Sequence, residues 1–275
     1  MDNVIVLIPL YRNYLEPFEE ISLKINLNYL DGFTINFISP VKLKNDAIFI
    51  KLLEKYKLDV VFFENKFFKN IAGYNKLMLD LHFYSTFKNY KFMLICQLDA
   101  LVLSNNLQFW VDQNYDYVGA PWVVEDGESI YFDSMGNGGL SLRKIDKFIE
   151  VLKSSDFYFN DKKFFFISNR VGFKNIFLIK LFNKFKKRGF KINFLKLYLF
   201  FYRSNEDYFW AFLAQFFTEE FNLASPNIAL KFAFELSPKR CYEANNKQLP
   251  FGCHAWSKYD KNFWLKILKD KGIDK

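Results

Sequence analysis

The chain has 275 residues, of which 51% are hydrophobic and 25% charged, and this composition excludes a disordered protein. Its three cysteines show no CxxC spacing, and their odd number argues against a disulfide framework. No apolar stretch reaches the roughly 20 residues of a membrane span. We therefore expect one cytoplasmic domain over residues 1–275 whose membrane contact is at most peripheral.

Strands and helices are expected to alternate over the first 120 residues. The apolar run 4–9 predicts a strand buried on both faces, and 16–30 predicts a helix that starts near Pro17. Further strands are expected at 33–39, 59–63, 92–98 and 115–120, and further helices at 46–56, 71–87 and 107–113. This alternation predicts an α/β fold with a Rossmann-type, mainly parallel sheet flanked by helices, which binds ligands at the carboxyl ends of its strands.

The pattern changes after residue 122. An acidic loop with Glu125, Asp126 and Glu128 is followed by a glycine cluster at 136–139. Helices are expected at 144–153, at 205–217 and near 263–269, and the tail from Pro226 to the last helix is expected to be irregular. Between them, residues 155–203 form a basic, aromatic-rich insertion.

Two motifs lie where a ligand is expected. Asp99 ends the strand at 92–98, although an acid at a strand end can equally cap the next turn. Gly136-Asn137-Gly138-Gly139 permits positive φ angles and close backbone approach to a ligand, and the helix expected after it would offer N–H groups to an anion. A plain turn is the alternative, and the Lys-Ser/Thr of a phosphate-binding P-loop is missing.

Two further motifs carry ionisable side chains. Glu206 and Asp207 open a predicted helix, where they could be simple cap residues. Neighbours on a helix point about 100° apart, so one acid can face a cleft while the other makes structural bonds. His254 is one of two histidines, and a lone histidine is more often structural than a ligand; we assign His82 to packing or the surface.

The order of these motifs resembles that of inverting GT-A glycosyltransferases. Asp99 resembles the second acid of their Asp-X-Asp motif, and Asn205-Glu206-Asp207 resembles their X-Glu-Asp motif. Gly136 to Arg143 resembles the glycine loop before their acceptor helix, and His254 their C-terminal metal-binding histidine. Gln97 departs from the family pattern, because a neutral amide replaces the first acid of Asp-X-Asp.

A closer resemblance is to a bacterial family of glycosyltransferase-like domains of unknown function. It is carried by the runs IAGYNK at 71–76, QLDA at 97–100, YDYVGAPW at 115–122 and GNGGLSLR at 136–143. The resemblance covers most of the chain apart from roughly 155–203. Both resemblances imply a GT-A-like fold.

The resemblance also implies roles for individual residues. Asp207 would be the general base, with Glu206 as the alternative, and Asp99 with His254 would hold Mn²⁺ or Mg²⁺. The donor side would comprise Pro9, Tyr11, Arg12, Asn75, Lys76, Gln97, Asp99, Gly138 and Gly139. The acceptor side would comprise Trp122 and Asn137. Because Gln97 supplies no charge, the need for a metal is less certain than in a complete Asp-X-Asp enzyme.

The implied reaction is transfer of a sugar from a UDP-sugar to a hydroxyl of a glycan or lipid-linked acceptor, with inversion, in bacterial cell-surface polysaccharide or lipopolysaccharide synthesis. One alternative is a membrane- or nucleic-acid-binding protein on a Rossmann-like scaffold, which leaves Asp99, Glu206 and Asp207 without a role. Another is a sugar nucleotidyltransferase, which needs a glycine-rich loop after the first strand, where Pro9 to Arg12 contains no glycine. We expect no nucleic-acid partner.

The insertion holds most of the positive charge. Residues 161–203 contain twelve Lys or Arg and one Asp, a net charge of +11, whereas the whole chain carries +8. Phe and Leu recur among these basic residues at helical spacing, which predicts basic amphipathic helices. They would suit the anionic inner face of a cytoplasmic membrane, and a solvated helical hairpin packed on the core is the alternative.

Overall fold

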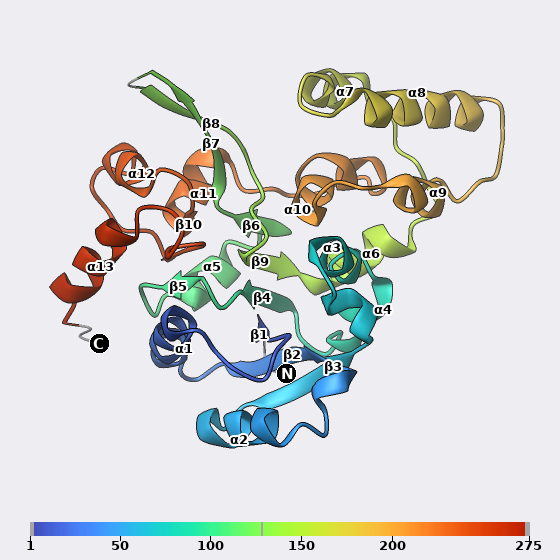
Figure 1. Cartoon of the computed structure of the whole chain (residues 1–275). Helices are drawn as coiled ribbons and strands as arrows, with labels where there is room; N and C mark the ends of the chain where they lie inside the picture. Colours follow the sequence, from blue (N-terminus) through green and yellow to red (C-terminus); the bar gives the residue numbers. More distant parts are fainter. Residues whose placement is uncertain (1–2, 128, 273–275) are drawn as a thin grey trace.

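A six-stranded sheet forms the centre of the computed structural model, which describes residues 3–127 and 129–272 (Figure 1). The strand order is β3 (Asp59–Phe63), β2 (Thr34–Pro40), β1 (Val4–Pro9), β4 (Phe92–Cys96), β9 (Leu140–Lys144) and β6 (Tyr117–Gly119). The first four strands run parallel, and β9 runs antiparallel to β4 and β6. The predicted mainly parallel sheet is confirmed.

Helices flank this sheet as expected. They are α1 (Pro17–Tyr29), α2 (Ala47–Tyr56), α3 (Ile71–Leu77), α4 (Leu81–Thr86), α5 (Leu107–Asp112) and α6 (Ile145–Lys153). The single helix expected over 71–87 is two, because the Asp80 carboxylate accepts a hydrogen bond from the His82 backbone N–H at 2.6 Å and caps a new helix.

Two predictions after residue 120 were wrong. The expected acidic loop is a hairpin of β7 (Pro121–Asp126) and β8 (Ser129–Met135), with Gly127 at a positive φ of 58° in the turn. Glu128, also assigned to that loop, lies outside the described residues. The helix predicted at 144–153 is found as α6, but strand β9, which was not predicted, separates it from the glycine cluster. The N-terminus of α6 therefore does not adjoin the cluster, as it would have to do to bind an anion there.

The C-terminal tail, expected to be irregular, contains regular structure. A small second sheet joins β10 (Ala233–Phe234), β11 (Gly252–Cys253) and β5 (Leu101–Val102). Around it lie α11 (Pro226–Phe232), α12 (Pro238–Ala244) and α13 (Lys261–Asp270). Strands of two residues are too short to show a hydrophobic period, which is why the sequence did not reveal them.

The basic insertion contains α7 (Asp161–Ser168), α8 (Phe173–Lys187) and α9 (Phe194–Phe201). Figure 1 shows α7 and α8 in yellow, set apart from the central sheet, with α9 below them. Their inner faces are apolar: Phe182 of α8 packs edge to face on Phe157 at 5.8 Å and lies 5.1 Å from the ring of Phe194. No helix within 3–127 and 129–272 is long and apolar enough to cross a membrane.

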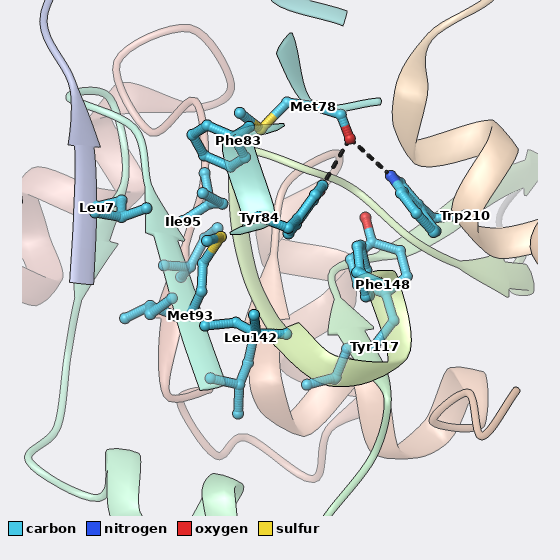
Figure 2. Close-up of a cluster of buried hydrophobic side chains, with 14 of the residues drawn as sticks. Leu7, Met78, Phe83, Tyr84, Met93, Ile95, Tyr117, Leu142, Phe148 and Trp210 are labelled. Atoms are coloured by element: carbon cyan, nitrogen blue, oxygen red, sulfur yellow. Dashed lines mark hydrogen bonds between the residues drawn. The ribbon is translucent and has the colours of Figure 1, made fainter. Parts of the chain in front are cut away.

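Buried aromatic side chains connect the sheet to the helices beside it (Figure 2). The Met78 carbonyl accepts hydrogen bonds from the Tyr84 hydroxyl at 2.9 Å and from the Trp210 indole at 3.2 Å. Trp210 in turn packs on Phe148 with ring centroids 3.9 Å apart. These contacts fix the segment around Trp210 against α4 and α6.

All three cysteines are buried free thiols, in agreement with the prediction. Burial raises the pKa of the Cys96 and Cys241 thiols to about 12, and it also raises the pKa of the Cys253 thiol well above its usual value.

Candidate active site

The two adjacent acids lie on a short composite helix. It consists of α10 (Glu206–Tyr208), a π-helical turn (Phe209–Leu213) and a 3₁₀ turn (Ala214–Phe216), where the sequence predicted one helix over 205–217. The Asn75 side chain accepts from the backbone N–H of Glu206 at 3.3 Å and donates to Asn205 Oδ1 at 3.1 Å. Helix α3 therefore holds the start of α10.

Glu206 points into the protein. It accepts two hydrogen bonds from the fully buried Arg143, at 2.8 and 3.1 Å. Arg143 lies on β9 and also donates to the Tyr84 hydroxyl at 2.9 Å. A Cβ atom at Gly138 would lie 2.3 Å from Glu206 Oε1, so this ion pair requires glycine there. Glu206 is thus engaged by the protein itself, in a geometry that favours a charged pair.

Asp207 has a different environment. Its side chain is half-buried, and Oδ1 accepts from the Tyr208 backbone N–H at 2.7 Å. Burial, and secondly the negative charge of Glu206, raise the pKa of Asp207 to about 7. A carboxylate with this pKa can take up and release a proton near neutral pH.

A second cluster is built by the register of the small sheet. Cys253 pairs with Leu101 and with Phe234, so the residues next to each of them come together. His254 Nε2 lies 3.3 Å from Asp99 Oδ1 and 3.1 Å from Gln97 Oε1, and His254 Nδ1 lies 3.3 Å from Glu235 Oε1. A Cβ atom at Gly139 would lie 2.1 Å from His254 Nε2, so the ring packs directly on the glycine backbone.

This cluster is negatively charged overall. Burial opposes the charge on His254, but hydrogen bonds and charge from Asp99 and Glu235 outweigh it and raise the pKa of His254 to about 10. One imidazolium therefore faces two carboxylates. If a metal ion displaces the proton of Nε2, Gln97, Asp99 and Nε2 of His254 would form a donor set suited to Mg²⁺ or Mn²⁺, whereas Glu235 faces the opposite side of the ring. The described part of the chain contains no group of three or more His, Cys, Asp or Glu side chains arranged around one metal position.

Both clusters lie at the carboxyl ends of β1 and β4. Leu7 of β1 pairs with Ile95 of β4, and the Gln97 N–H donates to the Gly139 carbonyl at 2.9 Å. Since Gly138 contacts Glu206 and Gly139 contacts His254, the two acid clusters flank the same edge of the sheet. In parallel sheets this edge is the usual place for a ligand.

The other residues assigned to the donor side are more scattered. Pro9 is buried at the end of β1. Arg12 forms an ion pair with Glu19 of α1 and lies over the ring of Tyr11 at 5.2 Å. Lys76 is exposed on α3, next to Asn75.

Of the two residues assigned to the acceptor side, Trp122 lies near the backbone of Asp207, and Asn137 lies within the glycine cluster. The Trp122 ring stacks on Phe212 at 5.1 Å, and the Asn137 side chain accepts from the Gly139 N–H at 3.2 Å. A Cβ atom at Gly136 would be 3.4 Å from the Asp207 carbonyl oxygen and 3.5 Å from the Trp122 ring. The indole therefore lies beside the segment that carries Asp207.

Sequence reasoning missed two functional candidates. Arg143 was noted as the end of the glycine motif and given no role. The sequence feature that could have indicated its importance is a single arginine that follows an apolar residue. Glu235 directly follows the apolar run of β10, much as Asp99 follows β4, and was overlooked because the tail was taken as irregular.

Comparisons with known proteins place the chain in one family. The galactosyltransferase LgtC in complex with donor and acceptor sugar analogues has 14% identity and a TM-score of 0.45, over 91% of this chain and 86% of that chain. Mouse xyloside xylosyltransferase 1 has 10% identity and a TM-score of 0.45, over 90% and 96%. A glycosyltransferase involved in glycosylation of the major capsid of PBCV-1 has 9% identity and a TM-score of 0.38, over 91% of both chains. No curated protein matches the sequence. The model of the family described as "Protein of unknown function (DUF5672)" matches residues 57–254, and the chain belongs to that family.

Proposed function

We propose that this protein is a glycosyltransferase that moves a sugar from a nucleotide-sugar donor to an acceptor hydroxyl. The observation that carries the proposal is the separation of the two adjacent acids. Glu206 is committed to the buried Arg143, whereas Asp207 is half-buried with a pKa near 7 at the ligand edge of the sheet. One acid is therefore structural, and the other is left for proton transfer.

In the proposed reaction Asp207 takes the proton from the acceptor hydroxyl as that oxygen attacks the anomeric carbon. The bond from this carbon to the nucleoside diphosphate breaks in the same displacement, so the anomeric configuration inverts. Removing the proton as the new bond forms is the contribution of Asp207. Glu206 cannot substitute for it without leaving the charge of Arg143 buried and unpaired.

The diphosphate would lie against Asp99 and His254. Because Asp99 and Glu235 outnumber the single positive charge of His254, this cluster would repel a diphosphate without an added cation. A divalent ion held by Asp99 and His254 would supply positive charge to the leaving diphosphate. Gln97 Oε1 lies 3.1 Å from Nε2 of His254 and orients the ring. In a complete Asp-X-Asp motif an aspartate would occupy this position and add a negative charge. The proposed donor side keeps Pro9, Tyr11, Arg12, Asn75 and Lys76, with UDP as the proposed nucleotide.

Exposed aromatic side chains support peripheral docking of the insertion to an anionic membrane. Six of its phenylalanines are between 54% and 80% exposed: Phe165, Phe173, Phe177, Phe190, Phe200 and Phe201. On α8, Phe173, Phe177, Lys180 and Lys184 follow one exposed stripe, opposite the buried Ile179 and Phe182. Apolar rings beside lysines are typical of helices that insert into an anionic interface. The acceptor would then be a lipid-linked glycan of the cell surface.

The first test is release of nucleoside diphosphate from a panel of nucleotide sugars in the presence of Mn²⁺. Asp207→Asn should lower this release by about 10²–10⁴-fold, because an amide cannot accept the proton. The exposed Asp126→Asn of the hairpin is the matched control and should retain activity. Full activity in Asp207→Asn would remove the proposed base, and release of pyrophosphate instead of diphosphate would indicate a nucleotidyltransferase.

The second test concerns the cation. UDP at about 100 times its Kd should stabilise the folded protein by about 2.7 kcal/mol, and Mn²⁺ should increase the resulting melting shift. Asp99→Ala should abolish the increase due to Mn²⁺, because the only carboxylate of the two proposed ligands is lost. An equal UDP shift with EDTA, with Mn²⁺ and in Asp99→Ala would contradict the metal assignment.

A further inference from the structure

A pocket of about 490 Å³ lies between the β7–β8 hairpin, the π-helical turn after α10 and the turn that joins α7 to α8. Its size falls in the range of small-molecule sites. The side chains that define it are Trp122, Tyr131, Asp133, Arg170, Tyr208 and Phe212. The insertion thus contributes one wall.

Aromatic rings form the apolar side of the pocket. Trp122 stacks on Phe212 with an angle of 22° between the rings, and Tyr208 packs on Phe212 at 4.9 Å. These contacts fix the rings, since each is held by a neighbour. Tyr131, on the hairpin, is 54% exposed and offers an open ring face.

A charged pair forms the polar side. The Arg170 guanidinium donates a hydrogen bond from Nε to Asp133 Oδ1 at 2.8 Å, and its Nη2 lies 2.7 Å from the same oxygen. Both side chains are about a third exposed. A carboxylate accepts hydrogen bonds and a guanidinium donates them, so the pair can bind groups that do both. Hydroxyl groups have this property.

The pocket adjoins the chain segment that carries the proposed base. Tyr208 follows Asp207 in the chain, and its hydroxyl donates to the Arg170 carbonyl, which ties the α7–α8 turn to α10. The Trp122 ring and the Asp207 carbonyl lie within 3.5 Å of the same point at Gly136. A molecule in this pocket would therefore lie beside the backbone segment that carries Asp207.

We propose that this pocket binds a pyranose ring, the terminal sugar of the acceptor; this assignment rests on the proposed transferase function. A pyranose combines an apolar C–H face, which packs on an aromatic ring, with hydroxyls that donate and accept hydrogen bonds. The rings of Trp122 and Tyr131 provide the first contact and the Asp133–Arg170 pair the second. The insertion then selects the acceptor by completing its binding site.

Saturation-transfer NMR with three probes tests this proposal: methyl β-glucopyranoside, methyl β-galactopyranoside and methyl α-mannopyranoside. The wild-type protein should transfer saturation to the ring protons of at least one of them. Tyr131→Ala should weaken binding about two- to tenfold, the value of one aromatic contact. Asp133→Asn should weaken it as well. Phe109→Ala is the control, because Phe109 is 52% exposed on α5 and does not line this pocket.

Absence of saturation transfer to all three glycosides, or equal binding by wild type and Tyr131→Ala, would overturn the proposal. The result is separable from the test of the transferase. If Tyr131-dependent glycoside binding persists while no nucleotide sugar releases diphosphate, the pocket is a sugar site and the proposed reaction is wrong. If diphosphate release depends on Asp207 but glycosides bind independently of Tyr131, the reaction holds and the pocket assignment fails.

Discussion

The region around α10 and the basic insertion use charge in opposite ways. Around α10, Arg143 and Glu206 are both buried and satisfy one another. In the insertion, Lys180, Lys184 and Lys187 are exposed on a helix on which Phe173 and Phe177 also face solvent. Buried charge is costly unless paired, whereas exposed charge costs little and can act on a partner. The first region is therefore expected to control stability, and the second to control binding.

The largest effect on stability is expected from Glu206→Ala. The change leaves Arg143 charged and buried without its carboxylate, which should lower the free energy of unfolding by about 3–5 kcal/mol, measured by urea denaturation. The control is Glu64→Ala, which removes an exposed pair with Lys66 of almost the same length, 2.7 Å, and should cost less than about 1 kcal/mol. Similar losses in the two variants would show that burial does not determine how much each ion pair contributes to the free energy of unfolding.

An intermediate effect is expected from Asp207→Asn, and it depends on pH. The folded-state pKa near 7 lies above the unfolded value of about 3.9, so ionisation of Asp207 opposes folding. Wild type and variant should be equally stable near pH 4, and wild type should fall behind as the pH rises to 7. We expect a gap of about 1–3 kcal/mol at pH 8, since the side chain is half-buried. Urea unfolding at several pH values measures it, and a gap independent of pH would contradict the raised pKa.

The smallest effect on stability is expected in the insertion. Phe173 and Phe177 are 80% and 55% exposed, so replacing both with Ser should change the free energy of unfolding by less than about 0.5 kcal/mol. The same variant should lose most of its co-sedimentation with liposomes that contain anionic lipid. Binding of the wild type should fall with added salt.

Phe109→Ser is the control for this experiment, because Phe109 is 52% exposed, close to the value for Phe177, but lies on α5 outside the insertion. It should leave liposome binding unchanged. If wild type binds neutral and anionic vesicles equally, or neither, the insertion is a solvated helical hairpin on the core and the membrane proposal is wrong.

The central sheet could be predicted because a strand that is buried on both faces appears in the sequence as an unbroken apolar run. The apolar runs of β1 and β4 are unbroken, and their ends were located to within two residues. Strand β9 and the β7–β8 hairpin were missed, since the glycines before β9 and the exposed acids of the hairpin resemble loops. Compact antiparallel additions to a sheet leave a weaker pattern than buried parallel strands.

The candidate site could be predicted only in part. Asp99, Glu206, Asp207 and His254 were chosen from local motifs, and the structure brings Asp99 to His254 and sets the two acids in different environments. The partners Arg143 and Glu235 could not be found this way. Arg143 meets Glu206 across 63 positions of sequence. Glu235 is brought to His254 by strands of two residues. Neither contact leaves a periodic pattern in the local sequence.

The buried thiols have a practical consequence for following these regions in solution. A thiol reacts as its thiolate, and Cys96, Cys241 and Cys253 are both inaccessible and kept protonated by their raised pKa values. Maleimide reagents should therefore leave the native protein unlabelled while it stays folded. A single cysteine introduced at Phe173 or at Tyr131 would then be the one reactive position. A fluorophore attached there reports on the insertion or on the hairpin, with no need to remove any native cysteine.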